Sequence, residues 1–350
     1  MQGEKSSMPD RSRITMSGLA KLSGVDISTV SRALNDSPLV NGKTKELILR
    51  LANETGYAIN ARARNLRKQS SQTLGIVIPV YPGSHQNLSD PFFLEMIGAV
   101  SQAAAKHDYD LIINLPHSPS EISERRLLVS GKADGLIVIG QAGRTERLSS
   151  LGDAANRVVV WGGMIDAADY TLVGSDNFEG GRLVGQHLKD IGRRHIVFLG
   201  DIDLPEVKLR YEGLVSALQG QGDEQDPPLL IPSSFDGHAA YRKILELCDS
   251  STGFDAIFAA SDVLGIAAIH AVQAKGLRVP EDVAIVGYDN IGQAEMISPG
   301  LTTIDQNIAL GGEIMVNALI DKIAGKQVSA TLTPTKLVIR GSTAGGKPKP

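Results

Sequence analysis

Apolar residues recur at two different spacings along the chain, and the spacing changes near residue 73. Between residues 14 and 59 they lie three or four positions apart, as in amphipathic helices around a small core. From Thr73 onward, runs of four to six apolar residues alternate with helical stretches, which indicates parallel strands buried on both faces. These runs are TLGIVIPV, YDLIINLP, ADGLIVIG, NRVVVWGG, HIVFLGD, PPLLIPS, DAIFAAS and VAIVGYD. The pattern predicts a helical head and a doubly wound α/β body.

Two short helices joined by a tight turn are predicted within residues 14–35. Gly24 suits the end of the first helix because glycine adopts positive φ readily. Asp26 or Ser28 can then cap the second helix. The inward apolar positions are Leu19, Ala20 and Leu22 in the first helix and Val30, Ala33 and Leu34 in the second.

The outer face of the second helix brings together Ser28, Ser31 and Arg32, because positions three and four apart are neighbours. A short helix that presents Ser and Arg outward, braced by another helix, is typical of a helix-turn-helix that enters the major groove. A third helix, begun by Asn41 or Thr44, completes the small core. Its inward positions are Leu47, Ile48 and Leu51.

This pattern divides the chain into five stretches. Residues 14–59 form the helix-turn-helix domain, and residues 73–342 form the body. Residues 60–72 are a linker rich in Ala, Arg and Leu, which favours a hinge helix that is too short to be stable alone in water. Residues 1–13 and the Gly/Lys/Pro-rich tail 343–350 are expected to be disordered.

The body is predicted to contain two parallel-sheet subdomains. The first covers about 73–174 plus 306–330, and the second covers about 175–305 plus 331–342. Ligands in open α/β sheets bind beyond the carboxyl ends of the strands, so two sheets that face each other enclose a cleft.

Charge is distributed unevenly over the 350 residues, whose formal net charge is −4. Residues 1–72 hold 12 Lys and Arg against 6 Asp and Glu, whereas the remainder holds 23 against 33. A basic head on an acidic body favours a polyanionic partner for the head alone, although small domains also vary by several charges without such a partner. The single cysteine, Cys248, fits a reducing cytosol, and neither a membrane span nor a signal peptide is expected.

No enzymatic constellation is found in the sequence. It lacks a G-x-S-x-G elbow, a phosphate-binding G-x-x-x-x-G-K loop and paired cysteines for zinc. The seven histidines are scattered, with no two within four residues. We therefore expect no catalytic residues, no metal and no cofactor.

The chain resembles the LacI (lactose repressor) family of bacterial transcription regulators over nearly its full length. In the head, the residues that carry the resemblance are Leu19-Ala20, Gly24-Val25, Ser28-Thr29-Val30-Ser31-Arg32, Leu34-Asn35, Thr44, Gly56-Tyr57 and Asn60. In the body, they are Asp90-Pro91-Phe92-Phe93, Ser175-Asp176-Asn177, Gly180-Gly181, Arg210, Gly213, Ser261-Asp262, Gly287-Tyr288-Asp289-Asn290 and Leu301-Thr302-Thr303-Ile304-Asp305-Gln306. The resemblance implies a periplasmic-binding-protein-like body.

The resemblance also implies which residues meet DNA. Arg32 matches guanine O6 and N7 in a bidentate pair, and Ser28 can bond to either base type. Ile27 lies either on the buried face or against a thymine methyl group. Leu66 either wedges into a base step from the minor groove or contacts the body. The complete DNA-contacting set is Ile27, Ser28, Thr29, Ser31, Arg32, Asn35, Asn41, Asn60, Arg64 and Leu66.

For the effector, the resemblance implies a ring of polar groups with an apolar plate. Trp161 ends a strand and either faces the cleft or packs under the sheet. Ser261 and Asp305 depart from the residues that the family commonly has there. The expected effector-binding set is Asp90, Phe92, Phe93, Trp161, Asp176, Arg210, Phe235, Ser261, Asp289 and Gln306.

These features predict a cytoplasmic homodimer that binds a double-stranded palindromic operator and responds to a mono- or oligosaccharide. Ligand closure of the cleft would melt the hinge and release DNA, or stabilise the hinge if the sugar is a corepressor. One alternative is a regulator that responds to another kind of small molecule. A second is a sugar-binding uptake protein, which would share the body but should begin with a signal peptide. A third, an enzyme on a doubly wound sheet, is disfavoured by the missing nucleophile.

Overall fold

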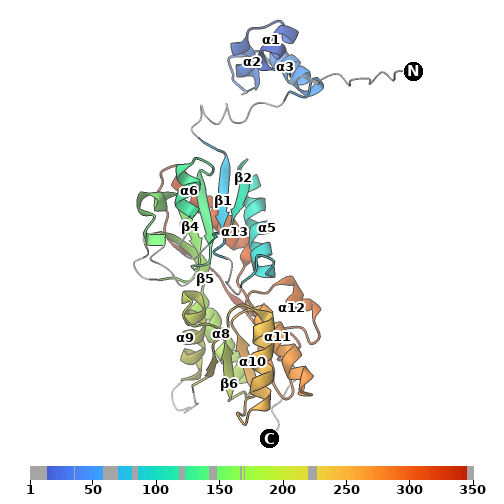
Figure 1. The fold of residues 1–350 in the computed structure, drawn as a ribbon, viewed down its shortest axis with the longest axis vertical. Helices are drawn as coiled ribbons and strands as arrows, with labels where there is room; N and C mark the ends of the chain where they lie inside the picture. The colour runs from blue at the N-terminus through green and yellow to red at the C-terminus, as the bar shows by residue number, and fades with distance from the viewer. Residues whose placement is uncertain are drawn as a thin grey trace, which may run out of the picture. The chain divides into compact units, whose positions relative to one another are not determined.

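Two units make up the chain, Met1–Gln69 and Ser70–Pro350, and each is described by itself (Figure 1). The structure is a computed structural model. It describes residues 14–34, 36–57, 70–80, 86–117, 123–141, 148–165, 168, 170–219 and 227–344. Within these residues, no helix combines the length and the apolar character needed to cross a bilayer.

The first unit contains three helices, α1 Met16–Ser23, α2 Ile27–Leu34 and α3 Gly42–Glu54. Thr15 caps α1 by accepting a hydrogen bond from the backbone N–H of Gly18 at 3.2 Å, and Gly24 ends α1 with φ of 70°. Asn41 caps α3 by accepting from the N–H of Thr44 at 2.8 Å. These caps satisfy backbone donors that a helix start leaves unpaired.

The core of the head is small and is built from all three helices. It contains the two predicted inward residues Leu19 and Ala20 of α1, whereas Leu22 is 54% exposed and does not belong to it. The rest of the core is Val30, Ala33, Leu34, Ile48 and Ala52. Since only seven buried residues hold the head together, its stability is marginal compared with that of the body.

The first lobe of the second unit is a six-stranded parallel sheet in the order β11-β5-β4-β3-β1-β2. Its strands are β1 Thr73–Val77, β2 Asp110–Asn114, β3 Gly135–Ile139, β4 Val158–Trp161, β5 Thr171–Ser175 and β11 Thr331–Thr333. Its helices are α5 Pro91–Ala105, α6 Ser123–Val129, the 3-10 helix η1 Gly152–Arg157 and α13 Ile308–Ile323. Successive residues of each strand face opposite sides of the sheet, and apolar helices cover both.

Helices α5 and α13 pack on one face of this sheet, where they bury side chains such as Ile76 and Ile137. Helix α6 and η1 lie on the other face, over Val77 and Val138. The two faces therefore carry separate apolar layers.

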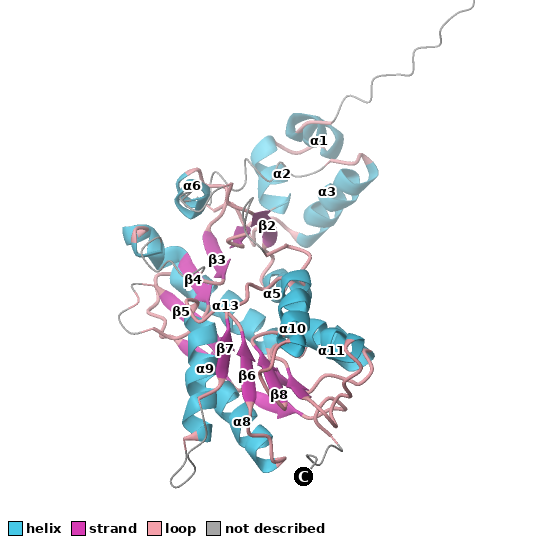
Figure 2. Cartoon of the chain, turned by 60° about the horizontal axis from the view of Figure 1, so that its bottom comes forward, coloured by secondary structure: helices cyan, strands magenta, loops and turns pink. Residues whose placement is uncertain are grey.

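The second lobe is a four-stranded parallel sheet in the order β7-β6-β8-β9. Its strands are β6 Ile196–Leu199, β7 Leu229–Ile231, β8 Ala256–Ala259 and β9 Ala284–Val286. Its helices are α8 Asn177–Asp190, α9 Pro205–Leu218, α10 Gly237–Asp249, α11 Asp262–Ala274 and the short α12 Gly292–Met296. The pair α8 and α9 lies on one side of the sheet and the pair α10 and α11 on the other (Figures 1 and 2).

Three neighbouring segments connect the lobes, after β5, after β10 (Thr303–Asp305) and after β11. They are joined by hydrogen bonds: Ser175 Oγ donates to Gln306 Oε1 at 2.7 Å, and Thr333 Oγ1 donates to the Gln306 carbonyl at 2.8 Å. The third segment leads to β12 (Lys336–Val338), which pairs antiparallel with β10. This joint supports the floor of any cleft between the lobes.

The expected boundary at residue 331 is wrong for one strand. Residues 331–342 were assigned to the second lobe, but β11 pairs in parallel with β5 at the edge of the first sheet. The chain crosses between the lobes only after Thr333. A three-residue strand of Thr and Leu carries no periodic pattern that could place it in either sheet.

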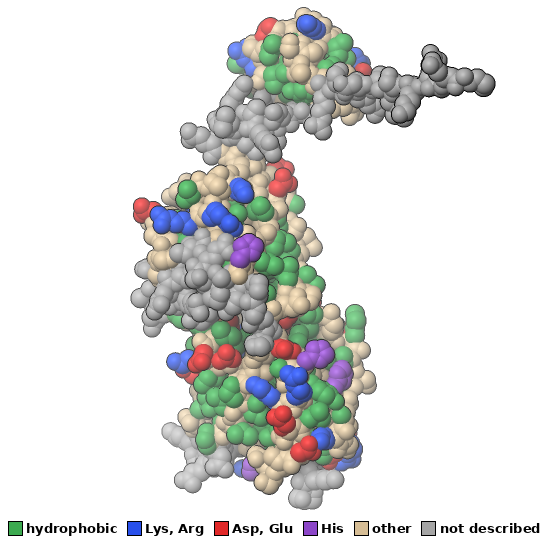
Figure 3. All heavy atoms as spheres, in the orientation of Figure 1, with side chains coloured by type: hydrophobic (Ala, Val, Ile, Leu, Met, Phe, Trp, Pro, Cys, Tyr) green, Lys and Arg blue, Asp and Glu red, His purple; other side chains and the backbone are tan. Residues whose placement is uncertain are grey.

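Acidic and basic side chains are interspersed with apolar ones on the face of the second unit that Figure 3 shows. The acidic excess of the body is thus not gathered into a single field on that face.

Helices α8 and α9 approach until their backbones nearly touch. A Cβ atom added at Gly213 would lie 2.0 Å from the Phe178 carbonyl oxygen, and one at Gly181 would lie 2.0 Å from the Arg210 carbonyl oxygen. Only glycine fits at these two crossing points. The close packing fixes the position of α9, which carries Arg210.

We predict that Gly213→Ala destabilises the second unit by about 1–3 kcal/mol, because the methyl group must push α8 and α9 apart. Gly98→Ala in α5 is the matched control, since nothing lies within 4 Å of its added Cβ. The control should be neutral or stabilising by up to about 1 kcal/mol. Urea unfolding followed by circular dichroism measures both, and equal midpoints for the two variants would contradict the close-packing account.

Candidate functional site

The exposed face of α2 carries the residues predicted to read DNA bases. Ile27 is 49% exposed and lies outside the head core, so it does not belong to the buried face of α2. Ser28 and Arg32 are also exposed, and Arg32 forms no ion pair with any described residue. No carboxylate among the described residues of the head therefore holds the guanidinium, whereas a purely structural role would require such a partner.

Asp26 caps α2. Its Oδ1 accepts from the backbone N–H of Thr29 at 3.0 Å, its Oδ2 accepts from the Thr29 hydroxyl at 2.9 Å, and the Ser28 hydroxyl donates to Oδ1 at 2.5 Å. These hydrogen bonds stabilise the charged carboxylate and lower the pKa of Asp26 to about 2, and the bond from the Ser28 hydroxyl has the largest effect. The Ser28 hydroxyl is thereby oriented, and its oxygen can still accept a bond from a base.

Thr29 and Ser31 are half-buried on the flank of α2, and the Asn41 side chain is engaged as the cap of α3. The remaining predicted DNA contacts Asn35, Asn60, Arg64 and Leu66 lie outside the described residues, as does most of the linker 60–72.

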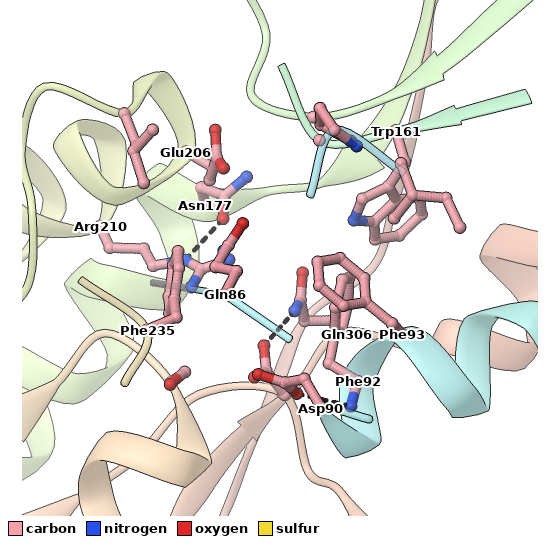
Figure 4. Close-up of a pocket in the computed structure, with 17 residues that line it drawn as sticks. Gln86, Asp90, Phe92, Phe93, Trp161, Asn177, Glu206, Arg210, Phe235 and Gln306 are labelled. Carbon is pink, nitrogen blue, oxygen red and sulfur yellow. Dashed lines mark hydrogen bonds between the residues drawn. The ribbon is translucent and has the colours of Figure 1, made fainter. Parts of the chain in front are cut away.

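In the second unit, one pocket opens where the carboxyl ends of strands from both sheets meet, which is where open α/β folds bind ligands (Figure 4). Nine of the ten residues predicted to bind the effector line it. They are Asp90, Phe92, Phe93, Trp161, Arg210, Phe235, Ser261, Asp289 and Gln306.

Asp176 is the exception. Its Oδ1 accepts from the N–H of Glu179 at 2.9 Å, so the carboxylate caps α8 and does not line the pocket. The next residue, Asn177, lines the pocket instead. A residue that starts a helix after a strand can either cap the helix or face the cleft, and sequence spacing does not distinguish the two roles.

Arg210 is the buried cation of the site, with only 4% of its surface exposed. Its Nε donates to Asn177 Oδ1 at 2.8 Å, and its Nη1 donates to the carbonyl of Ala260 at the end of β8. The guanidinium carbon lies 3.7 Å from the centre of the Tyr288 ring, a cation–π contact. These contacts fix the guanidinium at the edge of the second sheet.

Carboxyl groups surround this cation. Burial raises the pKa of Asp289 well above its ordinary value, although the charge of Arg210 acts in the opposite direction. Asp289 Oδ1 accepts from Gln306 Nε2 at 2.5 Å, which links the second sheet to a crossing segment. Burial also raises the pKa of Asp90, whose Oδ1 accepts from the N–H of Phe92 at 3.0 Å.

Aromatic rings form the opposite side of the pocket. Phe92 and Phe93 have ring centroids 5.6 Å apart, and Trp161 lies beside them (Figure 4). Trp161 both lines the pocket and packs against α13, since a Cβ atom at Gly311 would lie 2.4 Å from its ring. Both roles considered for the tryptophan are thus realised.

Sequence reasoning missed Gln86, Asn177 and Glu206, which also line the pocket. Asn177 lay within the Ser175-Asp176-Asn177 motif but was not singled out. Glu206 follows Pro205 at the start of α9, one turn before Arg210, and that spacing could have placed both on one face.

The two lobes touch on either side of the pocket. At one side, Gly163 of the first lobe meets the backbone of Glu206, and its added Cβ would lie 2.9 Å from the Glu206 nitrogen. At the other, Glu95 Oε1 of α5 accepts from the N–H of Gly292 at 3.0 Å. The structure therefore has the lobes in contact on both sides of the pocket.

Known proteins match the chain along nearly its whole length. Residues 15–60 match the family of bacterial regulatory proteins, lacI family, and residues 186–343 match the periplasmic binding protein-like domain. The HTH-type transcriptional regulator CelR of Thermobifida fusca is 32% identical over 339 residues, which cover 95% of this chain and 97% of that protein. The chain belongs to the LacI family. The HTH-type transcriptional repressor PurR of Pasteurella multocida is 30% identical over 336 residues, covering 94% and 98% of the two chains.

Solved structures agree with the predicted fold. A Lac repressor dimer bound to operator and the anti-inducer ONPF matches with a TM-score of 0.83 at 22% identity, covering 95% of this chain and 99% of that one. A complex of the regulator CelR with cellobiose matches with a TM-score of 0.68 at 30% identity, covering 94% and 100%. The predicted helix-turn-helix head and periplasmic-binding-protein-like body are confirmed.

As a LacI-family member, the chain is a ligand-responsive DNA-binding transcriptional regulator, as the sequence predicted. The relatives that establish the family are regulators and not enzymes.

The buried carboxyl group of Asp262 makes the stability of the fold depend on pH. Asp262 accepts from the Thr303 hydroxyl at 2.5 Å and from the N–H of Ile291 at 2.9 Å, and burial raises its pKa to about 7 despite these bonds. The folded state then holds this proton more tightly than the unfolded state, so stability is lost as pH rises from about 4 through about 7.

We predict that Asp262→Asn loses less stability than the unaltered protein between about pH 5 and about pH 8, because the amide does not titrate. Thermal unfolding at both pH values measures the difference. Identical losses in the two proteins would show that Asp262 does not carry this dependence.

Proposed function

We propose that this regulator is a repressor of carbohydrate-utilisation genes that a sugar releases from DNA. In this proposal it is a cytoplasmic homodimer, its operator is palindromic, and the sugar is a mono- or oligosaccharide. The observation that carries the proposal is the pocket itself, which is lined by aromatic rings together with carboxyl, amide and guanidinium groups. Such a combination suits a polyhydroxy ligand with apolar ring faces.

The relatives support the sugar, the dimer and the operator in this proposal. CelR, at 30% identity, forms a complex with cellobiose, and another regulator of the family, at 28% identity, is described with bound ribose. The Lac repressor structure that shares the fold is a dimer on its operator. A dimer with two identical heads reads a palindrome, because its two-fold symmetry matches that of the half-sites.

In the head, Arg32 is proposed to contact guanine and Ser28 to bond to a neighbouring base edge, with Ile27 against a thymine methyl group. Thr29, Ser31, Asn35 and Asn41 are proposed as phosphate contacts, which position the head without specifying sequence. Asn60, Arg64 and Leu66 are proposed to bind through the linker, with Leu66 in the minor groove.

In the pocket, Asp289, Gln306 and Arg210 are proposed to bond to sugar hydroxyls, with Asp90 and Ser261 completing the ring. Trp161, Phe92, Phe93 and Phe235 are proposed to pack against the sugar faces. A ligand that contacts both lobes favours their closed arrangement, and this preference is the free energy available to change DNA affinity.

Arg32→Ala is predicted to abolish preference at one operator base pair, at a cost of about 1–3 kcal/mol, because a bidentate contact is lost. Arg50→Ala is the control, since Arg50 is exposed on α3, not on α2, and its Nε lies 3.9 Å from Glu54 Oε1. Fluorescence anisotropy on an operator and on its single-base variants measures both. Unchanged base preference at every position in Arg32→Ala would refute the assignment.

Sugar is predicted to release the operator, and Asp289→Asn is predicted to need at least about tenfold more of the sugar that acts, because the amide nitrogen cannot accept a bond from a hydroxyl as the carboxyl oxygen does. The operator affinity of this variant without sugar should be unchanged. Asp249→Asn, which alters an exposed carboxylate paired with Lys275, is the control. Gel shifts with cellobiose, glucose and ribose test this, and the proposal fails if no sugar changes operator binding.

A further inference from the structure

Glu206 is the one pocket-lining carboxyl group among the described residues with a buried oxygen that lacks a partner. Its Oε2 is inaccessible to solvent and forms no hydrogen bond within the described chain. Neither Asp289 nor Asp90 has a buried oxygen without a partner, and each accepts a bond from another residue. A buried carboxyl oxygen without a partner costs free energy, so its presence at a pocket indicates that a ligand supplies the missing donor.

The position of Glu206 allows it to accept a hydrogen bond from a ligand in the pocket. It stands at the start of α9, where its own backbone N–H favours the charged form. Its side chain lies beside Asn177, on the side of the pocket opposite Trp161 and Phe93 (Figure 4). The contact between Gly163 and the Glu206 backbone holds this corner of the pocket between the lobes.

The charge of the pocket restricts what can bind there. Among the described residues that line it, Asp90, Glu206 and Asp289 are acidic, and Arg210 is the single cation. Arg210 already donates hydrogen bonds to Asn177 and to the Ala260 carbonyl and stacks on Tyr288. Burial raises the pKa of Glu206, although its own backbone N–H and the charge of Arg210 act in the opposite direction. An anionic ligand would add a further negative charge to this acidic pocket.

We infer that Glu206 is a specificity-determining residue that accepts a hydrogen bond from a hydroxyl of an uncharged saccharide and disfavours phosphorylated or carboxylated sugars. This assignment rests on the proposed sugar effector. It adds to that proposal the charge class of the ligand and the residue that reads it.

The test uses the full chain and three matched probe pairs: glucose with glucose 6-phosphate, ribose with ribose 5-phosphate, and cellobiose with cellobionate. Isothermal titration calorimetry should show that at least one neutral sugar binds and that its anionic partner binds at least about tenfold more weakly. This comparison needs no variant, so it can overturn the assignment even if a substitution disturbs folding.

Glu206→Gln tests the residue itself. It keeps the size of the side chain and should weaken binding of the neutral sugar at least about tenfold. The thermal unfolding midpoint without sugar should not fall, because the variant removes a carboxyl group whose burial is unfavourable. The matched control is Glu212→Gln in the same helix, where the carboxylate is exposed and its Oε1 lies 3.8 Å from Lys208 Nζ. The control should bind as the unaltered protein does.

Two results would overturn the assignment while leaving the proposed function intact: neutral-sugar binding by Glu206→Gln at the unaltered affinity, or equal or tighter binding of the anionic partner by the unaltered protein. If no sugar in the panel binds and none changes operator affinity, the proposed sugar effector itself fails, and this assignment fails with it.

Discussion

A buried guanidinium has to be hydrogen-bonded wherever it lies, and the site is organised around this requirement of Arg210. Its bonds reach Asn177 at the start of α8 and Ala260 at the end of β8, and its plane covers Tyr288 after β9. The ends of β8 and β9 in the second lobe are thereby held to the start of α8, which follows β5 of the first sheet. The near contact of α8 with α9 at Gly181 and Gly213 brings the guanidinium within reach of them.

The joint between the lobes continues this network. Asp289 bonds to Gln306, and Gln306 bonds in turn to Ser175, so that a polar chain runs from the second sheet through one crossing segment to another. Because these groups lie at the pocket floor and also at the joint, a ligand that bonds to them acts on the relative position of the lobes. Such an effect on the lobes is the first step that the proposed coupling of ligand occupancy to DNA affinity requires.

Much of this arrangement could be predicted from the sequence, because most of its strands are continuous apolar runs. All eight predicted runs are strands, whereas the sequence does not identify β5, β10, β11 and β12 as separate strands, because Gly, Ser, Thr, Asp or Lys interrupts the apolar run in each. Nine pocket residues follow from the family resemblance and from their places after strands. Asp176 and Glu206 do not, because the choice between capping a helix and facing a pocket depends on side-chain direction, which residue type alone leaves open.

The central claim is that occupancy of the pocket and binding of operator are coupled through one free energy, and linkage requires this coupling to be reciprocal. The most direct test is calorimetric titration of the full chain with the neutral sugar proposed as its effector, in the absence and in the presence of saturating operator. The account predicts that operator weakens sugar binding by the same factor by which sugar weakens operator binding. Equal sugar affinity in the two titrations would contradict it.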